Sequence, residues 1–498
     1  MVFSKWLGIP VVACWSWMSL ACQARVSALA TDPGAHLGSV ADAKWTVMVY
    51  MNAKNNLDPY SVVNFEQMTR VTDSNDVHIV VEWGRDRWKH AYRIKVHNGM
   101  SVKEEPVGGA PRIEDIGDVD MGSVVTIDSF VKWSVAKYPA QHYALVIWDH
   151  GSGYRLELTS PSDHQVGTRL MHADWLLEAV PQFVAPDPAR PGRWQSNYRA
   201  ISDDEHTKHH LYNSDVQAVV EGSPVDILGF DACLMSMVET AYAVRRGAKI
   251  MVGSEELEPG FGWKYDAWLG VLVGDPGLSP QAVGEAIVDA YEAQYGGVSA
   301  SPEPTATLAC TLLGNIEGLA ASMSRLSDVL ALTLDKQGVR GQVRAARERC
   351  WHYAPCYVAP DYGPLQPNDP AQFPRFNYVD LGAFCDGLDA EGNDATVRQA
   401  ARETRTALDG CLGKHWEGDA RKKSPWSAHG ISVYFPLSGR VYENDRANPE
   451  FGQGYERDNK DHPVEFVQKE SVHWTDFLHK YFATFPQGVP VVPPAGCQ

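Results

Sequence analysis

A histidine and a cysteine each follow a short apolar run of the kind that forms a buried parallel strand. His150 comes just after residues 143–148, and Cys233 comes just after residues 225–230. Residues beyond the carboxyl ends of adjacent parallel strands meet in one crevice. An imidazole there can take the proton of a thiol and later protonate a leaving amine. The placement therefore predicts a cysteine nucleophile with a histidine base. The alternative is that Cys233 is a small apolar filler.

The segments around this pair alternate between short apolar runs, typical of strands, and segments whose apolar residues recur at helical spacing. A helix is expected directly after the cysteine, over residues 234–246. Strands are expected at 45–51, 77–83, 91–96, 143–148, 225–230 and 249–253. This alternation predicts an α/β fold with a doubly wound sheet.

The chain divides by pattern into a catalytic core and a more helical part. The core covers residues 45–275 and contains a long irregular loop, 154–223, which we expect to be open to proteolysis. Helical periods predict a mainly helical subdomain over 276–428, with helices at 315–336, 338–349, 378–388 and 394–412. Residues 429–498 would hold a final strand, at 430–436, and a loosely held tail.

The N-terminus has the pattern of a secretory signal peptide. Lys5 precedes an apolar stretch that is too short to span a bilayer, and Ala28-Leu29-Ala30 is a small-x-small cleavage site. We expect residues 1–30 to be removed, a polar linker over 31–44, and a secreted or periplasmic protein. The alternative is a lipid anchor at Cys22. No other segment has the length and apolarity of a transmembrane span.

The charge and the cysteines limit the partners. The chain of 498 residues has a net charge of −18 at pH 7, which argues against nucleic acid and anionic membranes as partners and favours cationic substrates. Outside the signal region and Cys233, the cysteines form an even set, so we expect disulfides of undetermined connectivity. These cysteines are Cys310, Cys350, Cys356, Cys385, Cys411 and Cys497.

Several strings resemble one known family. WDHGSG and GFDACLM, each after an apolar strand, resemble segments of the clostripain family of cysteine peptidases, relatives of caspases, legumains and gingipains. The segments YMNAKNNLD, GDVDMGS, IMVGSEELEPGFGWKY and GISVYFP extend the resemblance over most of residues 45–436. The resemblance implies a caspase-like three-layer α/β/α sandwich with a mostly parallel sheet, plus the mainly helical C-terminal subdomain.

The resemblance also implies roles for individual residues. His150 would be the base and Cys233 the nucleophile, with the amides of Gly151 and Cys233 as the oxyanion hole. Asp231 matches the acidic residue at the base of the family's specificity pocket, implying cleavage after Arg or Lys; the alternative is a helix N-cap. We expect Glu255, Glu256 and Trp263 to line this pocket or to lie in a solvated loop.

A dyad is expected rather than a triad, because Asp149 and His150 are neighbours on an extended chain and point to opposite faces. Members of the family are often activated by cleavage between the histidine and the cysteine. Basic residues suited to self-cleavage there are Arg155, Arg169, Arg190, Arg193 and Arg199. The alternative is that these are ordinary arginines of an exposed loop.

The sequence offers candidate metal ligands but no complete metal-binding motif. Thiol chemistry needs no cofactor, but the family implies calcium, for which Asp118 and Asp120 offer oxygen ligands; the alternative is a polar turn. His206, His209 and His210 hint at zinc, yet they form no HExxH motif, so we expect solvated loop residues. Serine-hydrolase and phosphate-binding motifs are missing.

The leading hypothesis is therefore an exported cysteine endopeptidase that cuts after basic residues and is self-processed between His150 and Cys233. Two alternatives stay open. One is a catalytically inactive surface or binding homologue. The other is a cysteine-dependent amidase or transpeptidase, because an acyl-enzyme can be resolved by water or by an amine.

Overall fold

The structure, a computed structural model, describes residues 43–106, 112–156, 199–300, 302–350, 353, 378–392, 394–422, 427–436, 439, 442, 464–468 and 472–483. These residues belong to one compact unit, Asp42–Gln498. The expected signal peptide, the lipidation alternative at Cys22 and nearly all of the expected linker lie outside the described residues. So do Arg169, Arg190 and Arg193.

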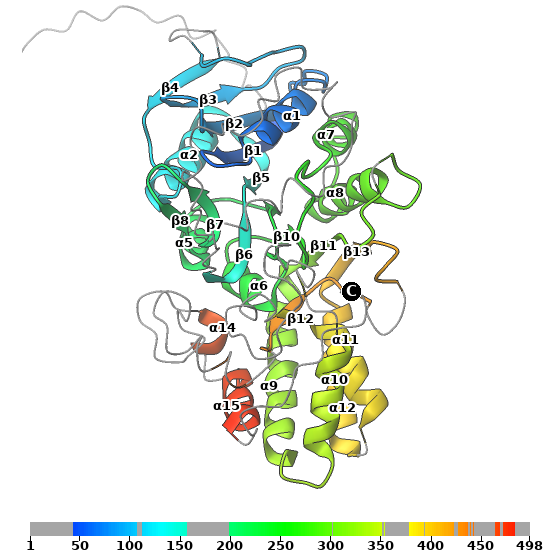
Figure 1. The fold of residues 1–498 in the computed structure, drawn as a ribbon. Coiled ribbons are helices and arrows are strands. Elements are labelled where there is room, and N and C mark those ends of the chain that lie inside the picture. Colours follow the sequence, from blue (N-terminus) through cyan, green and yellow to red (C-terminus); the bar gives the residue numbers. More distant parts are fainter. Residues whose placement is uncertain are drawn as a thin grey trace, which may run out of the picture. The chain divides into compact units, whose positions relative to one another are not determined.

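A nine-stranded sheet forms the centre of this unit (Figure 1). Its order is β13 (Leu412–Glu417), β11 (Thr307–Leu312), β10 (Ile250–Gly253), β9 (Ile227–Asp231), β5 (Ala140–Trp148), β1 (Ala43–Ala53), β2 (Val77–Arg85), β3 (Ala91–Lys95) and β4 (Ile113–Gly117). The five strands from β10 to β2 are parallel, and antiparallel strands flank them on both sides. The mostly parallel sheet expected from the sequence is confirmed.

Helices cover both faces of the sheet, as Figure 1 shows. The side chains of β1 alternate between the two layers: Met48 and Tyr50 pack in one core, and Val47 and Val49 pack in the other. The first core includes helices α2 (Val124–Lys137), α5 (Asn213–Glu221) and α6 (Val238–Val244); the second includes α1 (Asp58–Met68), α7 (Tyr265–Gly274) and α8 (Pro280–Tyr295). A sheet buried on both faces explains the nearly continuous apolar runs of its strands.

The structure differs from the expected irregular loop over 154–223. After the undescribed residues 157–198, β7 (Arg199–Asp204) pairs with both β6 (Gly151–Leu156) and β8 (His209–Leu211) in a small antiparallel sheet, and α5 follows. The sequence of β7 is largely polar, so it lacks the apolar run that would have predicted a strand. Its side chains bind other segments: the Asn52 amide donates to Ser202 Oγ at 3.2 Å, and Asp204 Oδ2 accepts the Met121 N–H at 2.8 Å.

The later part of the chain contributes strands to the central sheet, which its helical sequence pattern does not indicate. β11 and β13, inside the expected helical subdomain 276–428, belong to the central sheet. The helices there are α9 (Ile316–Thr333), α10 (Val339–Arg349), α11 (Leu381–Glu391) and α12 (Ala395–Asp409), after the short turn η2 (Leu313–Asn315). The helix expected at 378 begins at Leu381, because Asp380 caps it by accepting the Ala383 N–H at 2.5 Å.

A second small sheet ties the end of the chain to the core. β12 (Tyr378–Asp380) pairs with β14 (Ser432–Tyr434), and α14 (Glu465–Gln468) and α15 (Trp474–Ala483) follow.

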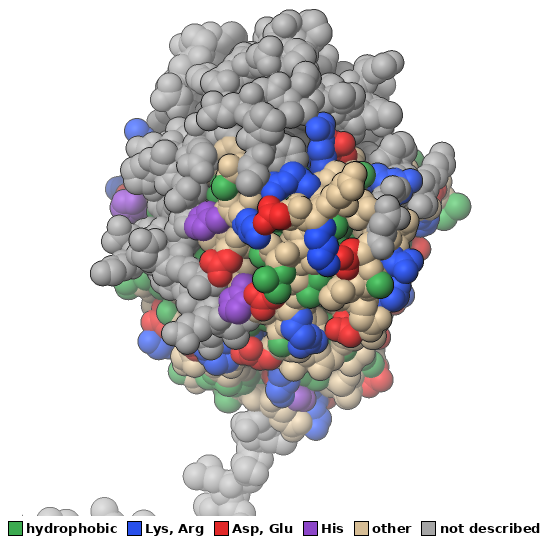
Figure 2. Space-filling model, turned by 90° about the horizontal axis from the view of Figure 1, so that it is seen from below, with side chains coloured by type: hydrophobic (Ala, Val, Ile, Leu, Met, Phe, Trp, Pro, Cys, Tyr) green, Lys and Arg blue, Asp and Glu red, His purple; other side chains and the backbone are tan. Residues whose placement is uncertain are grey.

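Among the described residues, no helix combines the length and apolarity needed to cross a bilayer. Figure 2 shows one face, on which Lys and Arg side chains are interspersed with Asp and Glu. The excess of acid is therefore not gathered into a single field on that face.

The expectation of disulfides is wrong for the four described cysteines apart from Cys233. Cys310, Cys350, Cys385 and Cys411 are buried free thiols, while Cys356 and Cys497 lie outside the described residues. Two of the four thiols donate to helix carbonyls one turn earlier, Cys350 to Ala346 O and Cys411 to Ala407 O. They fill the core as small apolar side chains.

Candidate active site

The ends of β5 and β9 bring the predicted base and nucleophile to the same edge of the sheet. The two strands are adjacent and parallel, and Trp148 pairs in register with Asp231. The Asp149 N–H extends this ladder to Asp231 O at 3.3 Å. His150 and Cys233 each stand two residues beyond that register pair. The apolar runs therefore predicted correctly which segments meet.

The backbone around the two residues is in direct contact. A Cβ added to Gly151 would overlap Cys233 O and would lie 3.0 Å from Met235 Cγ. Only a residue without a side chain lets the chain after His150 pass this close to the cysteine turn. The amides of Gly151 and Cys233, predicted to form the oxyanion hole, thus belong to touching segments.

Replacing Gly151 with alanine is expected to separate these segments. The overlap is with backbone, so either the His150 loop or the Cys233 turn must shift. We expect kcat to fall by at least about 10²-fold together with a lower Tm. Gly270→Ala is the matched control, because a Cβ added to Gly270 in α7 meets no atom within 4 Å. An unchanged kcat in Gly151→Ala would contradict the close contact.

Cys233 lies in a braced turn and not at the start of a helix. Leu234 adopts a left-handed conformation, with φ of 63°, and its N–H donates to Glu256 O at 3.1 Å. Ser236 Oγ donates to Gly430 O at 2.6 Å. Helix α6 begins only at Val238. The helix expected from residue 234 is therefore shorter, and the N-cap alternative for Asp231 is wrong because that residue ends β9.

The surroundings of Cys233 favour the neutral thiol. Its side chain is partly exposed, and Sγ accepts the Glu258 N–H at 3.2 Å. Burial, with smaller contributions from the carboxyl groups of Glu258, Glu256 and Asp231, raises the pKa of Cys233 to about 12, although the hydrogen bond from that N–H lowers it. The thiol is thus protonated at neutral pH, so a base must remove its proton when it attacks.

His150 is held both by its backbone and by its ring. Its N–H donates to Asp149 Oδ1 at 2.6 Å, and its ring Nε2 lies 2.6 Å from Asn56 Oδ1. Asp149 also accepts from the Asn55 amide at 2.6 Å. Burial, followed by the nearby charge of Asp203, raises the pKa of Asp149 well above its usual range. Asn56 lies within the quoted segment YMNAKNNLD, but its role was not predicted.

Asp231 is a buried carboxylate at the end of the strand that leads to Cys233. It is 4% exposed and accepts from the Tyr265 hydroxyl at 2.8 Å and the Trp263 N–H at 3.3 Å. Gly262, with φ of +58°, passes so close that a Cβ there would lie 2.6 Å from Asp231 Oδ1. Of the expected lining residues, Trp263 therefore does contact Asp231.

Glu258, which was not predicted, is hydrogen-bonded to Asp231 through its side chain. Burial raises the pKa of Asp231 to about 6, although hydrogen bonds from Glu258 and Tyr265 lower it. The pKa of Glu258 is raised well above its usual range by burial and by the charge of Asp231. Of these two carboxyls, Glu258 is therefore the one that holds a proton more readily.

Glu255 and Glu256 are internal, so the solvated-loop alternative is wrong for both. Glu255 Oε2 accepts the Gly430 N–H at 2.8 Å, and Glu256 pairs with the buried Arg421. Their exposed fractions are 1% and 3%. Both carboxylates thus bind segments from the later part of the chain.

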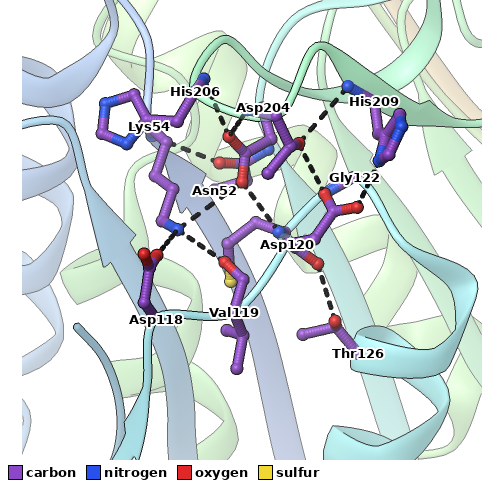
Figure 3. A network of polar contacts seen from close by, with 12 residues as sticks. Asn52, Lys54, Asp118, Val119, Asp120, Gly122, Thr126, Asp204, His206 and His209 are labelled. Atoms are coloured by element: carbon purple, nitrogen blue, oxygen red, sulfur yellow. Dashed lines mark hydrogen bonds and ion pairs between the residues drawn. The ribbon is translucent and has the colours of Figure 1, made fainter. Parts of the chain in front are cut away.

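The predicted calcium ligands are engaged with other protein groups (Figure 3). Asp118 Oδ1 lies 3.3 Å from Lys54 Nζ, and Asp120 Oδ2 lies 2.5 Å from His209 Nδ1. Asp120 Oδ1 also accepts from Thr207 Oγ1 and Gly122 N. In the described part of the chain, no group of three or more His, Cys, Asp or Glu residues is placed to hold a metal. These residues do not fit a calcium cage.

The three clustered histidines have separate environments. His206 Nε2 lies 2.8 Å from Asp86 Oδ1, and hydrogen bonding to Asp86 raises the pKa of His206. His209 is largely exposed, as expected. His210 is only 8% exposed and packs edge-on against Tyr212, so the expectation of a solvated side chain is wrong for it.

Comparison with known proteins agrees with this geometry. The model of the clostripain family matches residues 49–169 and 190–480. Clostripain of Hathewaya histolytica is 25% identical over 244 residues, which is 45% of this chain and 41% of that protein. The chain thus aligns with less than half the length of this relative.

A solved structure has a similar fold. It is that of a secreted cysteine protease from Bacteroides thetaiotaomicron in complex with an irreversible peptide inhibitor, with a TM-score of 0.50 and 16% identity. The match covers 88% of this chain and 99% of the other, which supports the caspase-like α/β/α architecture. Because the family model matches most of the sequence, the chain belongs to the clostripain family of cysteine peptidases.

Proposed function

We propose that this protein is an exported cysteine endopeptidase that hydrolyses peptide bonds after arginine or lysine, with His150 as base and Cys233 as nucleophile. The observation that carries the proposal is the register of β5 and β9. It places His150, Cys233 and Asp231 at one edge of the sheet. The name of the relative clostripain and the peptide inhibitor on the similar solved structure support the same reaction.

The reaction follows from the protonated thiol. The imidazole of His150 takes the Sγ proton as sulfur attacks the peptide carbonyl carbon, and the carbonyl oxygen becomes an oxyanion facing the amides of Gly151 and Cys233. The imidazolium then gives its proton to the leaving amine as the C–N bond breaks, which leaves a thioester. Water, deprotonated by the same imidazole, hydrolyses the thioester and restores the thiol.

The specificity follows from the buried carboxyl of Asp231 and its hydrogen-bonded neighbour Glu258. A guanidinium or ammonium group can bind between the two carboxyls and take the place of their mutual hydrogen bond. Gly262 lies against Asp231 Oδ1, so the turn before Trp263 must move to admit a long basic side chain. Binding of such a side chain would therefore be coupled to a shift of this turn.

A substrate panel with a cysteine control tests the proposal. In peptides that differ only at the residue before the scissile bond, arginine and lysine are expected to give kcat/KM at least about 10²-fold above glutamine. Cys233→Ala should cleave none of the peptides. Cys411→Ala, which alters a buried thiol between α12 and β13, should match wild type. Equal cleavage by Cys233→Ala would overturn the cysteine mechanism.

Two further outcomes separate the alternatives. A wild type that cleaves no peptide would favour the inactive binding homologue. Products joined to an added amine, in place of hydrolysed ones, would favour a transpeptidase, because the amine then resolves the thioester.

We also propose that the protein cuts itself between His150 and Cys233. The family model leaves residues 170–189 unmatched between its two ranges, and arginines flank that stretch. We expect purified wild type to become two chains, while Cys233→Ala stays one chain until active wild type is added. Wild type that is active and uncut, or Cys233→Ala that is cut when made alone, would contradict this proposal.

Export is proposed from the pattern of residues 1–30, with release after Ala30. Mass spectrometry of the N-terminus tests this directly. A mature chain that starts at a lipid-modified Cys22 would support the lipid-anchor alternative instead.

A further inference from the structure

We infer that Asn56 is a positioning residue for the base: its side-chain oxygen fixes the ring of His150 and selects the tautomer that can accept the thiol proton. The inference rests on the proposed peptidase function. Its basis is the 2.6 Å contact between Asn56 Oδ1 and His150 Nε2. Both residues are partly buried, so this contact is only partly open to water.

The chemistry of the contact decides the tautomer. An amide oxygen can only accept a hydrogen bond, so the contact requires a proton on Nε2. A neutral imidazole carries one N–H, and the lone pair is therefore on Nδ1. Nδ1 is then the nitrogen that exchanges a proton with the thiol. Without the acceptor at Asn56, the ring would lose this preference and could rotate about its χ angles.

Asn56 is itself held in place by its neighbour. It lies in the turn between β1 and α1, where Asn55 Oδ1 accepts the Leu57 N–H at 2.9 Å and Asn55 O accepts the Asp58 N–H at 3.2 Å. These bonds close the turn and set the direction of the Asn56 side chain. Because β1 pairs with β5, this turn emerges beside the strand that leads to the histidine.

The same turn also holds the backbone of the histidine. The Asn55 amide donates to Asp149 Oδ1 at 2.6 Å and to Asp203 O at 2.9 Å. Asp149 Oδ1 in turn accepts the His150 N–H at 2.6 Å. Two consecutive asparagines therefore fix the base at two points, Asn55 through the main chain and Asn56 through the ring.

Two substitutions separate positioning from a structural role. Asn56→Leu keeps the size of the side chain but removes the acceptor, and Asn56→Asp keeps an acceptor in the same place. We expect Asn56→Leu to lower kcat by roughly 10²-fold, with KM within about twofold of wild type. Asn56→Asp should recover kcat to within about tenfold of wild type. Tm is measured for both to exclude unfolding.

A matched control is Asn98→Leu. Asn98 also lies in a turn, and its amide donates to Thr69 O, Arg70 O and Val71 O. The substitution removes asparagine contacts remote from the strand ends that carry His150 and Cys233, so kcat and KM should equal those of wild type. A loss of kcat in this control equal to that of Asn56→Leu would overturn the inference.

The rate of Cys233 alkylation by iodoacetamide, followed by peptide mapping, needs no peptide substrate. At neutral pH, Asn56→Leu should slow it toward the rate of His150→Ala. An unchanged kcat and alkylation rate in Asn56→Leu, a rise in KM alone, or an Asn56→Asp variant as impaired as Asn56→Leu would each overturn the inference. If wild type cleaves no peptide but alkylation still depends on His150 and Asn56, the proposed function fails while the positioning role stands.

Discussion

His150→Ala is expected to lower kcat for a basic peptide by roughly 10⁴-fold, the upper range for loss of a general acid and base. The reason lies at the sulfur: burial raises the pKa of Cys233 to about 12, so almost no thiolate forms unaided at neutral pH. The measurements are steady-state kinetics and the rate of Cys233 alkylation. In the variant, alkylation should become fast only at strongly alkaline pH.

The matched control for this variant lies on the strand that leads to His150. His142 is near the other end of β5, where its Nδ1 lies 3.2 Å from Asp226 Oδ2. His142→Ala should leave kcat unchanged, with a change in Tm at most. If His150→Ala kept the wild-type kcat, or if its thiol were still alkylated rapidly at neutral pH, another group would have to be the base.

Asp231→Asn is expected to remove the preference for arginine and lysine. Leaving a buried cation without its carboxylate costs about 3 kcal/mol, or roughly 10²-fold in kcat/KM. A glutamine peptide should be cleaved about as well as by wild type, because the amide keeps an acceptor for the Tyr265 hydroxyl. Asp226→Asn, at the opposite end of β9, is the control and should keep the preference.

The pH dependence of wild type provides an independent check of the same carboxylate. Burial raises the pKa of Asp231 to about 6, so the charge that attracts a basic side chain is present above that pH and is lost below it. The preference for arginine over glutamine should therefore decline as the pH falls through about 6. A preference that is constant down to pH 4 would rule out Asp231 as its source.

The parts of the site that follow apolar runs could be predicted from the sequence. The runs before His150 and Cys233 are buried on both faces of a sheet, and such strands have a strong local signature. β7 was not expected, because the partners of its polar side chains, among them Asn52 and Met121, lie far away in the chain. A local sequence pattern carries no information about contacts between segments that are far apart in the chain.

Other contacts that the sequence did not indicate share this cause. Glu255 and Glu256 resemble loop residues in sequence, yet each binds a group more than 160 positions later. Asn56 meets His150 across 94 positions, and only the pairing of β1 with β5 brings them together. The four buried cysteines belong to a set of six for which disulfides were expected, because that number is even. Their helices and strands instead place them separately in the core.

The contact of Ser236 with Gly430 has a consequence for how the gene can change. Ser236 O also accepts the Ser432 N–H at 2.9 Å. The loop that contains Cys233 is therefore held by hydrogen bonds to residues that are translated almost two hundred codons later. A truncation or frameshift upstream of codon 430 would thus remove the hydrogen bonds that hold the loop of Cys233, in addition to the end of the chain. Until the ribosome has passed that point, the nascent enzyme lacks this support.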